Sequence, residues 1–207
     1  YKNIKNLKQH INNAFYWSKL KKVIIEKYIY GIELTVETFF QNGKMNITAI
    51  TSKKKIKKTN GTVAYELSTY KLSNYNYLKL KSIIYTSYKC SGFRNGVGHA
   101  EIIKSDNSFY IIEIAGRGPG FDVFDKFIPL LTGINMPKFL IKNSTKQKVT
   151  LNIKEHNQGL IRYFPSKKGK IKNIRGFEEL QKYKKVYGKK IAKIGDLTDN
   201  AITDGDR

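Results

Sequence analysis

The sequence contains few residues of several kinds, and each shortage excludes a class of protein. A single cysteine, Cys90, excludes an intramolecular disulfide framework and makes a reducing cytoplasm the expected compartment. No apolar run approaches the ~20 residues that a membrane span needs, so no membrane partner is expected. Acidic residues are also scarce, with 16 Asp and Glu against 39 Lys and Arg, for a net charge of +23.

The excess of positive charge is diffuse. Only five of the basic residues are arginine, the side chain whose planar fork suits base edges, and the lysines are dense only in the run 53–58. We interpret most of this charge as solvated surface; attraction of a phosphorylated ligand and nucleic-acid binding are the alternatives. Because 40% of the residues are hydrophobic and 13% are aromatic, the chain is expected to fold.

Hydrophobic periodicity predicts an α+β fold in which an antiparallel sheet has flanking helices. The predicted helices are 3–20, 77–88, 121–131 and 177–183; the predicted strands are 23–25, 34–40, 45–51, several short ones within 147–174 and a final one; 53–75 is predicted to be a lysine-rich loop. The Asn42–Gly43 dipeptide predicts a two-residue hairpin turn that pairs Phe40 with Met45, Val36 with Ala49 and Leu34 with Thr51.

A second hairpin brings two of the scarce carboxylates together. Its strands run from His99 to Ile103 and from Ile111 to Arg117, and a three-residue loop, 106–108, pairs Ile102 with Ile112 on an apolar face. The other face then carries Glu101 directly opposite Glu113. Like charges in that arrangement destabilise a sheet unless a cation lies between them, and carboxylate oxygens suit Mg²⁺, with Mn²⁺ as a substitute. The alternative is a solvent-exposed hairpin whose carboxylates are screened by lysines.

Three further side chains are candidates on the same reasoning. Arg117 extends the carboxylate face and is suited to a phosphate or carboxylate oxygen. His99 lies on that face as well, and either contacts a substrate or phosphate or is a satisfied structural histidine. Arg94, in a glycine-rich loop, is a candidate for binding a substrate carboxylate.

With these residues in view, the chain resembles the ATP-grasp superfamily of carboxylate–amine and carboxylate–thiol ligases. The segment VIIEKYIYGIELTVE (residues 23–37) is similar to the hinge of that family, and GHAE (98–101) with IEIAGRGPG (112–120) is similar to its paired metal-binding strands. The resemblance covers the chain from its first helix to its closing Asp-Gly-Asp-Arg, and points to the carbamoyl-phosphate-synthase-like and L-amino-acid-ligase-like branches.

The resemblance implies a role for each matching residue. Glu26 would begin the hinge, the backbone of Lys27, Tyr28 and Ile29 would meet the adenine edge, and Ile29 and Ile103 would form apolar walls. Glu33 would accept hydrogen bonds from the ribose hydroxyls. Glu101 and Glu113 would bind the magnesium that bridges the ATP phosphates, and Arg117 would steady the transferring phosphoryl group or the acyl phosphate. The implied partners are ATP, a small carboxylate substrate and an amine or thiol acceptor.

Two departures from the family pattern qualify that reading. Ala115 stands where many members have a metal-binding Asn, which weakens assignment to carbamoyl-phosphate or biotin-carboxylase chemistry. The glycine-rich phosphate loop and the preceding domain do not occur in the sequence either. The chain is therefore expected to be the C-terminal half of a ligase, inactive alone, with three parts: 1–52 with the hinge, 53–140 with the metal-binding hairpin, and 141–207 as a small β-rich subdomain.

Two other hypotheses stay open. One is a basic nucleic-acid-binding module, which the net charge and 14 tyrosines support, although we consider a nucleic-acid partner the weaker hypothesis. The other is an ATP-grasp scaffold that has lost catalysis. A homodimer is compatible with all three hypotheses.

Overall fold

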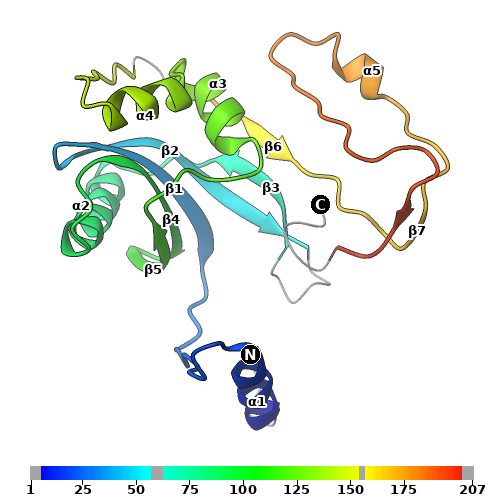
Figure 1. The fold of residues 1–207 in the computed structure, drawn as a ribbon, viewed down its shortest axis with the longest axis horizontal. Coiled ribbons are helices and arrows are strands. Elements are labelled where there is room, and N and C mark those ends of the chain that lie inside the picture. Colours follow the sequence, from blue (N-terminus) through cyan, green and yellow to red (C-terminus); the bar gives the residue numbers. More distant parts are fainter. Residues whose placement is uncertain (1–5, 57–62, 154–156, 202–207) are drawn as a thin grey trace.

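A computed structural model describes residues 6–56, 63–153 and 157–201, and its centre is a six-stranded antiparallel sheet with strand order β5-β4-β1-β2-β3-β6 (Figure 1). The strands of this sheet are β1 Ile32–Gln41, β2 Lys44–Lys55, β3 Ala64–Thr69, β4 Gly96–Ser105, β5 Ser108–Ala115 and β6 Leu160–Arg162. The helical segments are α1 Leu7–Trp17, α2 Asn74–Cys90, η2 Val123–Phe127, α3 Ile128–Thr132, α4 Met136–Ser144 and α5 Phe177–Leu180. The predicted α+β class is confirmed.

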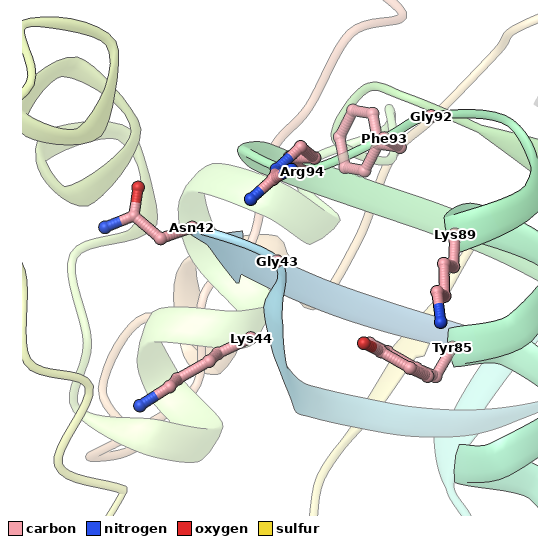
Figure 2. A pocket seen from close by; sticks show the side chains of 8 residues that line it. All are labelled: Asn42, Gly43, Lys44, Tyr85, Lys89, Gly92, Phe93 and Arg94. Carbon is pink, nitrogen blue, oxygen red and sulfur yellow. The ribbon is translucent and has the colours of Figure 1, made fainter.

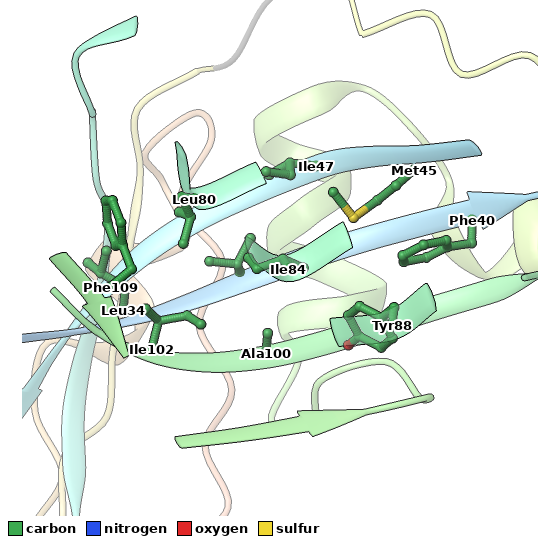
Figure 3. Packing of buried hydrophobic residues seen from close by; sticks show 11 residues of the cluster. Leu34, Phe40, Met45, Ile47, Leu80, Ile84, Tyr88, Ala100, Ile102 and Phe109 are labelled. Carbon is green, nitrogen blue, oxygen red and sulfur yellow. The ribbon is translucent and has the colours of Figure 1, made fainter. Parts of the chain in front are cut away.

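Helix α2 covers one face of the sheet, which we call the α2 face. The helix begins after Ser73, whose hydroxyl accepts a hydrogen bond from the Asn76 N–H, as an N-cap residue does. Its buried residues, Leu80, Ile84 and Tyr88, pack on the inward side chains of β1, β2, β4 and β5 (Figure 3). The sheet members of this core are Leu34, Val36, Phe40, Met45, Ile47, Ala100, Ile102 and Phe109.

The opposite face is apolar at one end and polar at the other. Helices α3 and α4 lie over the end nearest the β1–β2 turn (Figure 1), and a second core there includes Phe39, Ala49, Val97, Phe127 and Met136. We call this side the α3/α4 face. The other half of the same face carries polar side chains from three adjacent strands, Glu33, Thr35, Glu37, Thr51, His99 and Glu101, so the candidate site lies on it.

The first hairpin has the predicted turn but only part of the predicted register. Phe40 pairs with Met45, and Asn42 and Gly43 both have positive φ angles, +52° and +78°. Beyond Thr38 a β-bulge shifts the register, so Val36 pairs with Ile50 instead of Ala49, and Leu34 with Ser52 instead of Thr51.

The extra residue in this bulge is Thr48. It is completely buried, and its hydroxyl donates to the Glu37 carbonyl at 3.1 Å. The bulge turns the side chains of Thr51 and Lys53 from the α2 face, where the predicted register would place them, to the α3/α4 face.

The second hairpin confirms the pairing of Glu101 with Glu113 and corrects the turn. Ser105 pairs with Ser108, so the loop has two residues, and Asp106 takes a positive φ of 49°. A bulge between Glu101 and Ile102 compensates for the shorter loop, and Ile102 consequently pairs with Ile111 instead of Ile112. The shorter loop and the bulge shift the register in opposite directions, so Glu101 still pairs with Glu113.

Three other segments differ from the sequence prediction. Residues 23–25 do not form a buried strand; Ile24 and Ile25 are 83% and 67% exposed in a segment without regular structure. The predicted loop 53–75 contains the end of β2 and the whole of β3, whose sequence, AYELST, does not alternate between apolar and polar residues and so indicates a strand only weakly. Helix α4 was missed, although Asn135 caps it by accepting from the Lys138 N–H.

The C-terminal segment adds strand β6 to the main sheet and a separate pairing of β7 Gly169–Lys170 with β8 Leu197–Thr198. The predicted part boundaries at 52 and 140 stay predictions. The closing Asp204–Arg207 and the first residues of the predicted helix 3–20 lie outside the described residues. Across the described ranges, the structure contains no helix with the length and apolar composition of a membrane span.

Candidate functional site

The polar half of the α3/α4 face gathers side chains from three adjacent strands. Strand β1 contributes Glu33 and Glu37, β2 contributes Lys53, and β4 contributes His99 and Glu101. Alternate residues of a strand point to the same face, and Glu37 pairs directly with His99 across β1 and β4, so these groups lie side by side. We call these five residues the charge network.

Lys53 is the centre of the charge network. Its ammonium is 3.1 Å from a Glu33 carboxylate oxygen and donates a 2.5 Å hydrogen bond to Glu101, while the side chain is only 10% exposed. Burial by itself would lower the pKa of Lys53, but the hydrogen bond and charge of Glu101, together with Glu33, outweigh burial and raise it. Lys55 forms a further ion pair with Glu33. Glu33 and Glu101, the two carboxylates of the charge network that are predicted to bind ATP and metal, are therefore neutralised by lysines of the chain.

His99 lies between two carboxylates. Its Nδ1 donates to Glu37 at 2.8 and 3.0 Å, and its Nε2 is 3.5 Å from Glu101. Burial opposes protonation, yet the hydrogen bonds and charges of Glu101 and Glu37 raise the pKa of His99 to about 9. In return, the hydrogen bond from His99, acting against burial and supported by Lys53, lowers the pKa of Glu101 to about 2. At neutral pH the network therefore holds an imidazolium and an ionised carboxylate.

These pKa shifts predict how stability depends on pH in metal-free buffer. The raised pKa of His99 contributes stability that is fully present below 6.5 and is lost as the pH rises through about 9. The lowered pKa of Glu101 contributes stability that is present above 4.5 and is lost as the pH falls through about 2. Urea unfolding should therefore show a plateau between pH 4.5 and 6.5 and an alkaline loss of about 3 kcal/mol.

A His99→Gln variant should remove most of the alkaline loss, because glutamine does not titrate. A His10→Gln variant, altered on α1 and away from the sheet, should keep it. An alkaline limb that is equally steep in His99→Gln would show that other groups cause it.

Glu113 and Arg117 lie at the edge of the charge network. Glu113 is exposed and pairs with Glu101 across β4 and β5, and in the described part of the chain it makes no ion pair. Arg117 is also exposed and donates to the Gly118 carbonyl at 3.1 Å, so its guanidinium is not held by the carboxylates.

The paired carboxylates, Glu101 and Glu113, fit a divalent metal that takes two protein carboxylates and completes its shell with water and phosphate oxygens. Within the described ranges no group of three or more acidic, histidine or cysteine side chains is arranged to hold a metal. A metal here would therefore need ligands from a bound nucleotide as well as from the protein.

The segment with the predicted hinge residues, Glu26 to Ile29, runs without regular structure into β1. Tyr28 is 55% exposed and Ile29 is half-buried. Gly31 allows the segment to approach β4, since a Cβ at this position would lie 2.3 Å from the Lys104 carbonyl oxygen and 2.7 Å from the Ile103 side chain. Gly31, two residues after the last predicted hinge residue, therefore lies against Ile103 at the Glu33 end of the charge network.

Arg94 lies elsewhere. Its backbone carbonyl accepts from the Gly43 N–H at 2.9 Å, so it is placed at the β1–β2 turn, the far end of the sheet from Glu33. No role was assigned from the sequence to two members of the network, Glu37 and Lys53. The alternation of the first hairpin places Glu37 on the same polar face as Glu33, whereas the position of Lys53 depends on the bulge at Thr48.

The model of the ATP-grasp domain family matches residues 1–123, more than half of the chain, and the chain therefore belongs to that family. A comparison with curated protein sequences gives no match.

Solved structures show the same fold. An L-amino acid ligase from Bacillus licheniformis matches 84% of this chain with a TM-score of 0.73 and 21% identity. A phosphoribosylglycinamide synthetase from Anaerococcus prevotii matches 83% with a TM-score of 0.63 and 19% identity, and a biotin carboxylase from Campylobacter jejuni matches 76% with a TM-score of 0.62 and 17% identity. The chain spans 44%, 45% and 36% of these three proteins, respectively.

Proposed function

We propose that this chain is the nucleotide- and metal-binding part of an ATP- and Mg²⁺-dependent carboxylate–amine ligase. The observation that carries the proposal is the charge network, where Glu33 and Glu101 lie on one face at the end of the hinge and Glu113 pairs with Glu101. Family membership and the similarity to an L-amino acid ligase support it. A cytoplasmic location, an amine or thiol acceptor and a homodimer belong to the same proposal.

Each residue has a defined task in this proposal. The backbone of residues 27–29 binds the adenine edge beside Ile103, and the Glu33 carboxylate accepts hydrogen bonds from the ribose hydroxyls. Glu101, ionised because its pKa is about 2, and Glu113 hold the metal. When bound, that metal neutralises charge on the ATP phosphate oxygens. Lys53 leaves the carboxylates when the nucleotide takes its place, and its ammonium then faces the phosphates.

The proposed reaction has two steps. A carboxylate oxygen of the substrate attacks the γ-phosphorus of ATP, and the bond between the γ-phosphorus and the bridging oxygen of the β-phosphate breaks. ADP departs, and the substrate is then an acyl phosphate. The amine or thiol then attacks the acyl carbon, loses its proton and displaces inorganic phosphate. Arg117, exposed at the end of β5, stabilises the negative charge of the transferring group. The protonated His99 adds a positive charge at the same end of the network.

One observation favours a second candidate, an ATP-grasp scaffold without catalysis. Lys53 and Lys55 already neutralise Glu33, and Ala115 stands where the family often has a metal-binding Asn. Such a scaffold would keep the fold but would not bind Mg²⁺–ATP, so a binding measurement separates the two candidates.

The test is a calorimetric titration of the chain with ATP in excess Mg²⁺. We expect saturable binding that weakens about tenfold in a Glu33→Gln variant, because a hydrogen bond to a charged acceptor is lost. An Asp125→Asn variant, which alters an exposed carboxylate on η2, is the control and should bind as the parent does. Absence of saturable binding would favour the scaffold, and equal affinity of Glu33→Gln and parent would contradict the role of Glu33.

A further inference from the structure

A hollow at the β1–β2 turn lies away from the charge network and has a different character. Its volume is about 460 Å³. Figure 2 shows the residues around it: Asn42, Gly43, Lys44, Tyr85, Lys89, Gly92, Phe93 and Arg94. Asn42 and Glu33 are nine positions apart along the chain, which corresponds to about 30 Å for an extended strand. A ligand of the hollow would therefore not be the nucleotide bound beside the hinge.

The charges around the hollow have one sign. Lys44, Lys89 and Arg94 are basic, Tyr85 adds a hydroxyl, and none of the lining residues that the structure describes is acidic. In Figure 2 the Arg94 guanidinium lies above Gly43 and to the left of it, whereas the Tyr85 hydroxyl and the Lys89 ammonium lie to the right of Gly43. In a chain with 16 acidic residues, most of the carboxylates that could neutralise such a cluster are used or located elsewhere.

A second hollow adjoins the first at the turn and is also lined by basic residues. It shares Asn42 and Lys44 with the first hollow and adds Lys146 and Lys148. None of its described lining residues is acidic either. Five basic side chains, from β2, the end of α2, the Arg94 loop and the segment after α4, therefore border the two hollows at this end of the sheet.

The loop that carries Arg94 is held in place before any ligand binds. The Gly43 N–H donates to the Arg94 carbonyl at 2.9 Å, and the Asn42 N–H donates to the Asn95 side chain at 2.8 Å. Phe93 packs against Phe40, with ring centroids 5.1 Å apart. A site whose loop is already ordered loses less entropy when a ligand binds.

The nearby end of α2 does not oppose an anion as strongly as an open helix C-terminus would. The carbonyls of Ser87, Tyr88 and Lys89 accept hydrogen bonds from the N–H groups of Ser91, Phe93 and Gly92, respectively. These carbonyls are therefore satisfied within the chain.

We propose that this hollow is a second anion site, which binds a small ligand through its phosphate groups. An arginine fork, ammonium groups and a tyrosine hydroxyl are the donors that phosphate oxygens take, and arginine binds them in a bidentate manner. The adjoining hollow suits a ligand with more than one phosphate, because Lys44 borders both hollows. The site is independent of the proposed ATP site and would bind a phosphorylated second substrate or effector.

The test is a calorimetric titration of the chain with pyrophosphate in metal-free buffer, so that metal-bridged binding at Glu101 and Glu113 does not contribute. We expect one saturable site whose affinity falls about tenfold or more in an Arg94→Gln/Lys89→Gln variant, since charge-assisted hydrogen bonds are lost. A matched Arg175→Gln/Lys138→Gln variant removes the same charge from exposed positions elsewhere and should bind within about twofold of the parent.

Three results would overturn the proposal. Equal weakening in the two double variants would show that only the overall charge attracts pyrophosphate. Loss of affinity in Lys53→Met alone would place pyrophosphate in the charge network. Binding of a single-stranded oligonucleotide, with a steep salt dependence and without any saturable pyrophosphate binding, would assign the surface to nucleic acid instead. Far-ultraviolet circular dichroism and thermal unfolding of each variant would show that the fold is retained.

Discussion

A Glu113→Gln variant is expected to bind Mn²⁺–ATP about a hundredfold more weakly than the parent chain. Glutamine keeps the size of the side chain but removes one of the two paired carboxylates. Loss of a group that only orients a metal ligand usually weakens metal binding 10- to 100-fold, and loss of a ligand itself should reach at least the upper end of that range. Glu113 is exposed and without an ion pair in the described ranges, so its replacement should not lower the free energy of unfolding. Free Mn²⁺, followed by electron paramagnetic resonance, measures the effect.

A Glu178→Gln variant, altered at an exposed carboxylate in α5, is the matched control and should bind Mn²⁺–ATP like the parent. In a longer protein that includes a glycine-rich phosphate loop, the Glu113→Gln change should also abolish ATP-dependent ligation while the fold persists. Turnover that survived this change, or an unaltered Mn²⁺ affinity, would show that the metal is held elsewhere.

A Lys53→Met variant is expected to lose about 3 kcal/mol of unfolding free energy at pH 7, because it leaves two partly buried carboxylates without their shared cation. Lys55 still pairs with Glu33, and His99 still lies near Glu101, which keeps the loss at the lower end of the range for a broken buried pair. Urea unfolding monitored by circular dichroism measures it.

The same variant should be less affected in mild acid. Without Lys53, the pKa of Glu101 rises, so protonation of this carboxylate in mild acid relieves the variant more than the parent. A Lys138→Met change, at an exposed position of α4, should have little effect on the free energy of unfolding at either pH. A loss in Lys53→Met below about 0.5 kcal/mol, or one equal at pH 7 and pH 4.5, would show that the network does not depend on this ammonium.

Local features of the sequence were sufficient to predict the two hairpins and the pairing of Glu101 with Glu113. Asn42–Gly43 predicts a turn because both residues accept positive φ, and the apolar alternation assigns Leu34, Val36 and Phe40 to one face. The pairing of Glu101 with Glu113 was predicted correctly although the loop length was not, because the requirement to bury Ala100 and Ile114 on one face sets the register at that point.

The sequence by itself determined the α+β class, the two hairpins and the positions of the scarce carboxylates, because strand alternation and turn chemistry are local. Only the tertiary structure decided that Lys53 lies between Glu33 and Glu101. One extra residue, Thr48, moves every later side chain of β2 to the opposite face, and its place depends on the Glu37 carbonyl from another strand. A bulge set by a contact between strands leaves no periodic signal along one of them. The scarcity of acidic residues is thus visible in the sequence, but the fold decides that Lys53 and Lys55 are the lysines that neutralise Glu33 and Glu101.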